Sequence, residues 1–206
     1  MKKVRGYLLP FLFGVGVGSL LVWLILSYRT RIPAANSESV DNNGDSTPDA
    51  KYYYDNGVII KAEHDRNFDG RFDVFEFFED GTIKKAEMDD NFDGRLDAWL
   101  EYEDGNVLIS KHDTDKNGIP DLFVHFKYGV INIAIWRPNR ASKVARVDIY
   151  EDAAKSKTYI DKDGNGLLDT LVIFDEMENE QSTETLMPEV PPENIVHAQL
   201  IGRLNN

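Results

Sequence analysis

Polar and apolar positions along this 206-residue chain repeat with a period of 24 residues. Five of the six copies start with a nine-residue stretch rich in Asp, Asn and Gly, and the copies continue with two short stretches that contain aromatic and β-branched residues. The copies follow one another without insertion or deletion and begin at Asp41, Asp65, Asp89, Asp113, Arg137 and Asp161. So strict a register is typical of an array in which each unit buries its apolar face against its neighbours.

The apolar stretches predict β-hairpins. In the second copy, residues 74–79 and 82–87 flank the turn pair Asp80-Gly81. Such a pair between aromatic and β-branched residues is a strong hairpin signal, and six residues are too few for an ordinary helix. The residue two before each turn pair is aromatic and predicts a core stripe across the hairpins: Tyr54, Phe78, Tyr102, Phe126, Tyr150 and Phe174.

We therefore predict an all-β fold, an antiparallel meander of six 24-residue loop-hairpin repeats. Two strands per copy give roughly ten to twelve strands and place every nine-residue loop on the same edge of the sheet. An open twisted sheet, a rolled sheet and a closed barrel all fit this pattern. Position 8 of the loops is apolar and is expected to turn inward while the acids turn out: Pro48, Phe72, Leu96, Pro120, Val144 and Leu168.

The N-terminal residues follow a different pattern, with 23 consecutive uncharged residues from position 6 to position 28 between Arg5 and Arg29. This run is long enough to cross a bilayer as a helix. Residues 32–35 (Ile-Pro-Ala-Ala) match a signal-peptidase site poorly, so we expect residues 1–28 to be an uncleaved membrane anchor. The alternative is a signal peptide whose removal releases a secreted protein.

Basic residues bracket the predicted span, three before it and two after it. This bias favours a cytoplasmic N-terminus and a C-terminal domain outside the cytoplasm, in the periplasm or the extracellular space. Gly14 and Gly18 have a spacing that lets two membrane helices approach closely and form a homodimer. The alternative is that glycine is simply common in membrane helices.

The other predicted segments are a linker at residues 29–40, the repeat domain at residues 41–184 and a proline-containing tail at residues 185–206. In the tail, Val196, Leu200 and Leu204 fall at helical spacing. They predict a short helix that packs on the open sheet edge or, alternatively, meets a partner.

The charge of the chain is −13, and residues 1–31 carry +5, which leaves −18 for the remainder. Such an acidic body excludes nucleic acid as a partner, because phosphate binding needs clustered Lys and Arg, and it favours metal cations. The chain has no cysteine, which excludes disulfides and thiolate chemistry.

Oxygen side chains occupy positions 1, 3, 5 and 9 of five loops, and glycine occupies position 6 of four. A loop needs this arrangement to wrap around a hard cation such as Ca²⁺. In the first copy Ser46 replaces the glycine. The predicted metal ligands, with Glu76 added at position 12 of the second copy, are Asp41, Asn43, Asp45, Asp49, Asp65, Asn67, Asp69, Asp73, Glu76, Asp89, Asn91, Asp93, Asp97, Asp113, Asp115, Asn117, Asp121, Asp161, Asp163, Asn165 and Asp169.

These loops resemble the EF-hand-like Asp-x-Asp-x-Asp-Gly calcium loops of dockerins, thrombospondin type 3 repeats and integrin-type propeller blades. The resemblance covers the nine-residue loops and implies Ca²⁺ ligation by the side chains above, with a backbone carbonyl from position 7. It departs from the EF-hand at position 12, where a glutamate occurs only once, as Glu76. We therefore expect the loop starting at Asp65 to bind most tightly and the loop starting at Asp41 most weakly. The alternative is that the loops are Asx-turns that need no metal.

The fifth copy breaks the pattern, because residues 137–146 lose the acids and gain basic residues. Either these cations neutralise the acids of neighbouring loops, or they form a docking site for an acidic partner or lipid headgroup. Substituting Arg140 and Lys143 would separate the two interpretations.

The sequence indicates no enzyme. His64 and His112 occupy the same repeat position, and no nucleophile motif or glycine-rich phosphate loop occurs. We predict a membrane-anchored, calcium-binding repeat protein with a structural or protein-interaction role outside the cytoplasm. The alternative is a calcium-independent β-repeat scaffold that recognises a protein partner.

Overall fold

The structure is a computed structural model that describes residues 36–138 and 143–201. The predicted membrane span, with Gly14 and Gly18, lies outside the described residues. Within the described ranges, no helix has the length and apolar character needed to cross a bilayer.

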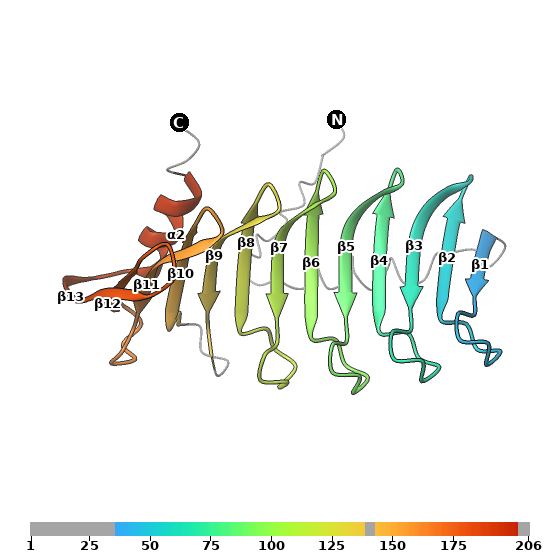
Figure 1. The fold of residues 1–206 in the computed structure, drawn as a ribbon, viewed down its shortest axis with the longest axis horizontal. Coiled ribbons are helices and arrows are strands. Elements are labelled where there is room, and N and C mark those ends of the chain that lie inside the picture. The colour runs from blue at the N-terminus through green and yellow to red at the C-terminus, as the bar shows by residue number, and fades with distance from the viewer. Residues whose placement is uncertain (1–35, 139–142, 202–206) are drawn as a thin grey trace, which may run out of the picture. The chain divides into compact units, whose positions relative to one another are not determined.

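Thirteen described strands form one antiparallel sheet in chain order, which confirms the all-β meander and shows an open sheet with β1 and β13 at its two edges. In Figure 1, β2 to β9 form a row with the nine-residue loops along one edge and the tight hairpin turns along the other. The strands are β1 (Ser37–Val40), β2 (Ala50–Asp55), β3 (Val58–His64), β4 (Val74–Glu79), β5 (Thr82–Met88), β6 (Ala98–Glu103), β7 (Asn106–His112), β8 (Leu122–Lys127), β9 (Val130–Trp136), β10 (Arg146–Glu151), β11 (Ala154–Ile160), β12 (Leu168–Phe174) and β13 (Glu180–Val190).

The hairpin turns have the geometry that their sequences predict. Asn56 and Gly57 between β2 and β3 have φ values of 50° and 80°, and Asp80 and Gly81 between β4 and β5 have 50° and 75°. Two successive positive φ values are typical of the type I′ turn that matches the twist of antiparallel strands. The strand register shifts by one residue beside each of these turns, and such bulges increase the local twist.

Two predicted boundaries differ from the structure. β1 lies inside the predicted linker, where Ser37–Val40 pairs with β2 in register from Ser37 opposite Tyr53 to Val40 opposite Ala50. β13 extends from Glu180 to Val190 into the predicted tail. The sixth copy therefore has a second strand, and the acidic residues 175–179 form the turn before it.

From β2 to β7 the sheet is a single layer. Its fully buried apolar side chains are small and include Ala50, Ala62, Ala86 and Ala98. The aromatic stripe that we expected in a core is only half-buried, as at Tyr54. The reason is that the described residues contribute no second layer over these strands.

The apolar core lies further along the sheet, where the helix α2 (Pro192–Ile201) packs on β9 and β10. Ile195 and Val196 contact a buried cluster made of Ile133, Ile135, Val144, Val147, Ile149 and Leu168. The side-chain amide of Gln199 also donates to Asn132 Oδ1 at 2.9 Å. The predicted helix is thus confirmed, but it covers a face of the sheet and not its edge, because the apolar side chains of β9 and β10 gather on that face.

Candidate metal-binding loops

The six nine-residue loops are called loop 1 (residues 41–49), loop 2 (65–73), loop 3 (89–97), loop 4 (113–121), loop 5 (137–145) and loop 6 (161–169). Neighbouring loops are joined through their backbones at the base. The amide of Asp89 donates to the carbonyl of Asp73 at 2.8 Å, and the amide of Asp113 donates to the carbonyl of Asp97 at 2.8 Å. Positions 1 and 9 are therefore fixed by the sheet, while positions 2 to 8 project from it.

The loop backbone turns through two left-handed residues. At position 6, φ is 86° at Gly70 and 95° at Gly166, as the glycine pattern predicts, and Ser46 adopts 73° in loop 1. Position 4 is also left-handed, with φ of 62° at both Phe68 and Phe92. Sequence reasoning missed this second turn, although Gly44 and Gly164 occupy position 4 in loops 1 and 6 and were an available signal. For a residue with a Cβ, this conformation costs roughly 1–2 kcal/mol.

Amides of the loop orient its own oxygen side chains. In loop 2, Asp65 Oδ2 accepts from Gly70 N at 2.7 Å, and Asn67 Oδ1 accepts from Asp69 N at 3.1 Å. Asp69 Oδ1 in turn accepts from Arg71 N at 2.9 Å. Loops 3 and 4 repeat these contacts. The predicted ligands at positions 3 and 5 thus form successive Asx-turns in loops 2 to 4, and the position 1 carboxylate accepts from the amide of position 6.

The carboxylates at position 9 close the loops from the sheet side. Asp97 Oδ2 accepts from the amides of Asp90 and Asn91 at 3.1 Å each, and Asp73 Oδ2 accepts from the amide of Arg66 at 3.0 Å. We expected the acids to turn outward, but seven at positions 1 and 9 are buried because they cap these amides. They are Asp49, Asp65, Asp73, Asp89, Asp97, Asp113 and Asp121.

Two cationic side chains lie among the acids of loops 2 and 3. Arg66 Nε lies 2.9 Å from Asp73 Oδ1, and its Nη2 lies 3.2 Å from Asp90 Oδ1. Lys116 of loop 4 reaches back to loop 3, where its Nζ lies 2.9 Å from Asp97 Oδ2. Sequence reasoning missed both contacts, because nothing in the pattern shows which acid a long side chain reaches.

Loop 6 brings three carboxylates closer together than the other described loops do. One oxygen from each of Asp161, Asp163 and Asp169 lies within 4.8 Å of the other two, and no other trio of acids or histidines in the described ranges does so. Hydrogen bonds from the Thr170 hydroxyl and from the amides of Lys162 and Asp163 lower the pKa of Asp169. This acid is therefore ionised at neutral pH.

A carboxylate from outside the repeat pattern borders loop 6. Asn165 Nδ2 donates to Glu189 Oε2 at 2.9 Å, and Glu189 belongs to the edge strand β13. Nothing in the repeat pattern indicated this contact, because Glu189 lies in the tail beyond the last copy.

Glu76, the predicted position 12 ligand, lies on β4 opposite Ala62 and Ala86. Its Oε2 is 3.4 Å from His64 Nε2. The structure thus places Glu76 beside the strand residue that precedes loop 2. The predicted ranking, in which Glu76 makes loop 2 the tightest, finds no support in this contact.

Loop 5 supplies a cation to loop 6. Lys143 Nζ donates to the carbonyl of Asn165 at 2.9 Å and to that of Gly164 at 3.4 Å. Its aliphatic chain lies so close to Gly166 that a Cβ there would meet Lys143 Cδ at 3.1 Å. The basic copy therefore packs against its neighbouring loop, but Lys143 contacts backbone carbonyls there and not the acids that the first interpretation has it neutralise. Arg140 lies outside the described residues.

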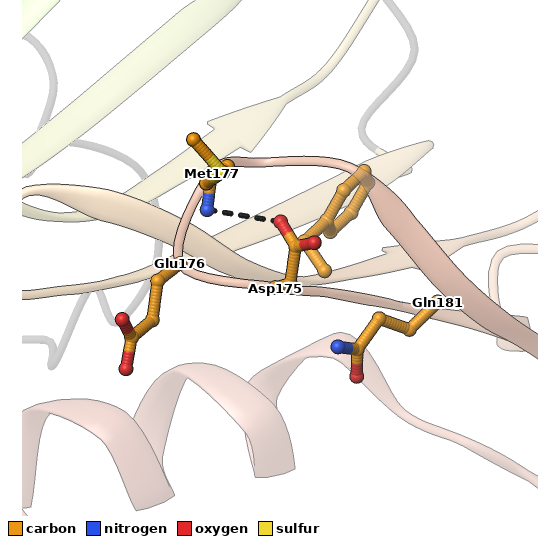
Figure 2. A pocket seen from close by; sticks show the side chains of 5 residues that line it. Asp175, Glu176, Met177 and Gln181 are labelled. Atoms are coloured by element: carbon orange, nitrogen blue, oxygen red, sulfur yellow. Dashed lines mark hydrogen bonds between the residues drawn. The ribbon is translucent and has the colours of Figure 1, made fainter.

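A shallow pocket lies away from the loops, at the turn between β12 and β13. Figure 2 shows its lining by Asp175, Glu176, Met177 and Gln181, with the amide of Met177 bonded to Asp175. Asp175 Oδ1 accepts from the amides of Met177 and Asn179 at 2.9 Å each. Hydrogen bonds from the Asn179 amide and side chain lower the pKa of Asp175. The Asp175 carboxylate thus stabilises the turn in which it lies.

The chain matches no protein-family model and no curated protein sequence. Three solved structures share limited similarity with it. TarM has 16% identity over 56% of this chain and 22% of its own, with a TM-score of 0.36. A point mutant of S. aureus TarM in complex with fondaparinux, alpha-GlcNAc-glycerol and UDP has 13% identity, coverages of 67% and 24%, and a TM-score of 0.26. The GtfA/B complex bound to UDP and GlcNAc has 8% identity, coverages of 86% and 28%, and a TM-score of 0.28.

The chain spans between 22% and 28% of the length of these three structures. TM-scores this low indicate neither a shared fold nor a shared activity.

Proposed function

We propose that this protein is a membrane-anchored calcium-binding repeat protein with a structural or protein-interaction role outside the cytoplasm. The calcium part of the proposal rests on the three carboxylates of loop 6, because one oxygen from each lies within 4.8 Å of the other two. Like charges this close repel one another unless a cation lies among them. The anchor part rests on the uncharged run at residues 6–28.

The donor set fits calcium. The side chains at positions 1, 3, 5 and 9 offer only oxygen, which Ca²⁺ prefers, and each carboxylate keeps free lone pairs beside the hydrogen bonds that it accepts. In loop 6 the ion would be held by Asp161, Asp163, Asn165 and Asp169, with Glu189 nearby. Magnesium fits less well, because it demands stricter octahedral geometry and retains its waters.

The consequence for the fold is modest at each site and larger for the array. Extracellular calcium modules bind at about 10⁻⁴–10⁻³ M. At millimolar calcium, mass action then adds roughly 0–1.5 kcal/mol of stability per occupied loop. Calcium therefore has a structural role if several loops bind it at the same time.

Calorimetric titration of the full-length chain in detergent micelles tests the proposal. Calcium should bind with a dissociation constant of about 10⁻⁴–10⁻³ M, and the double substitution Asp161→Asn and Asp169→Asn should remove at least one site. Asp175→Asn is a matched control, because Asp175 also caps a turn but lies outside the loops. No heat of binding for the unmodified chain up to several millimolar calcium would contradict the proposal.

The alternative is a calcium-independent scaffold that recognises a protein partner, and one observation favours it. Every buried side-chain nitrogen and oxygen in the described part of the chain has a hydrogen-bond partner without any metal. Under this alternative the same titration shows no binding, and unfolding is identical in chelator and in calcium.

The proposal includes no catalytic step. His112 Nε2 lies 2.9 Å from Ser110 Oγ, and burial lowers the pKa of His112. His64, at the same repeat position, lies beside Glu76. Both histidines thus interact with neighbours on the sheet.

A further inference from the structure

We infer that Arg66 and Lys116 act as built-in counter-cations that decide which loops take up metal. They neutralise loops 2 and 3 from within the chain and leave the carboxylates of loop 6 for a divalent ion. The inference rests on the proposed calcium binding and adds the residues that set the occupancy of each loop.

Lys116 forms an ion pair with the carboxylate oxygen that a metal ion in loop 3 would need as a ligand. Asp97 is the position 9 acid of that loop, only 3% exposed, and its Oδ2 lies 2.9 Å from Lys116 Nζ. A cation attached by a short flexible link acts at an effective concentration on the order of millimolar. It therefore competes with calcium in the range in which such loops bind.

Arg66 has the same effect on loop 2 through more contacts. Besides the contacts of Nε with Asp73 and of Nη2 with Asp90, Nη2 donates to the carbonyl of Asp89 at 2.9 Å. The guanidinium carbon lies 5.4 Å from the centre of the Phe92 ring, a distance typical of a cation–π contact. Arginine does not deprotonate in proteins, so this neutralisation is permanent.

Among the described residues, loop 6 has no cationic side chain paired with its carboxylates. Lys162 occupies the position of Arg66, and its backbone amide donates to Asp169 Oδ2 at 2.9 Å. Across the described residues, no ammonium or guanidinium forms an ion pair with Asp161, Asp163 or Asp169. Lys143 approaches loop 6 at two backbone carbonyls instead. No ion pair among the described residues thus neutralises the closest trio of carboxylates.

The test is calcium titration of full-length Lys116→Gln and Arg66→Gln beside the unmodified chain. Each variant should gain either one further site or at least about tenfold affinity, because its position 9 oxygen is released. Lys116→Arg should behave like the unmodified chain. Lys111→Gln is the matched control, since Lys111 also forms a surface ion pair, 2.8 Å from Glu101, with a similar side-chain exposure of 38% against 40% for Lys116.

A second measurement separates the effect of calcium from the loss of stability that the substitution itself causes. In chelator, Lys116→Gln and Lys111→Gln should both melt slightly below the unmodified chain, and calcium should restore the first more than the second. If the unmodified chain binds calcium and both glutamine variants give its isotherm unchanged, the inference is overturned while the proposed function stands. If the unmodified chain and both variants bind no calcium, the proposed function fails and the inference with it.

Discussion

The sheet contains two regions that are ordered by different interactions. From β2 to β7, one layer of strands buries mainly alanines, and the buried polar groups beside them include seven carboxylates of loops 1 to 4. From β9 to β12, branched aliphatic side chains form a core under α2. The repeat sequence is the same in outline, and in the first region, where little apolar surface is buried, the buried carboxylates accept hydrogen bonds from loop amides. Charge should therefore matter most in the first region, and apolar volume in the second.

The largest expected effect is in the apolar region. Leu168 is fully buried at 0% exposure in the cluster under α2. Leu168→Ala should lower the free energy of unfolding by about 2–5 kcal/mol, because it leaves a cavity in a packed core. Urea unfolding measures this loss. Leu108→Ala, at a leucine 38% exposed on the single-layer part, should cost under about 0.5 kcal/mol. Equal losses at both sites would contradict the comparison.

The next effect is expected in the charged region. Asp97→Asn removes the charge that binds two loop amides and Lys116. The predicted loss is about 1–3 kcal/mol, the usual cost of unpairing buried polar groups. Asp80→Asn is the control, since asparagine already occupies the same turn position at Asn56, and its stability should barely change. Chemical denaturation of both variants measures the difference. If Asp97→Asn left the free energy of unfolding unchanged, the loop carboxylates would not be needed for stability.

The sequence predicted the parts of this structure that depend on local conformation. Glycine at position 6 and the Asn-Gly and Asp-Gly pairs require positive φ, so the loops, the hairpins and their order along the sheet follow from residues such as Gly70 and Gly57. Five loops in register also located the candidate site on one edge.

Other features depend on which residues meet in space, and the pattern could not give them. The approach of Lys116 to Asp97 joins residues in different copies. The covering of β9 and β10 by α2 depends on where the tail returns. Asp73 and Asp97 are buried although they are charged, because they accept hydrogen bonds from loop amides that need acceptors.

The smallest expected effect is a loss of stability at alkaline pH, and it arises in the single-layer region. The Tyr53 hydroxyl donates to Glu63 Oε2 at 2.7 Å, and burial together with Glu63 raises the pKa of Tyr53 from 10.0 to about 12. A pKa that is higher in the folded state stabilises below pH 10 and loses this contribution as the pH rises toward 12. Solvent screening limits the effect to about 1 kcal/mol or less. Tyr53→Phe should flatten this part of the stability profile above about pH 10, and an unchanged slope would show that Tyr53 does not contribute.

Thermal unfolding of the full-length chain in chelator and then in millimolar calcium tests the central claim, calcium binding by the loops, most directly. We predict a higher melting temperature in calcium, and a gain that shrinks when Asp161 and Asp169 are both replaced by asparagine. The gain should remain in the Asp175→Asn control. Identical melting temperatures in chelator and in calcium for the unmodified chain would contradict the account and favour a scaffold whose acids bind only its own amides and cations.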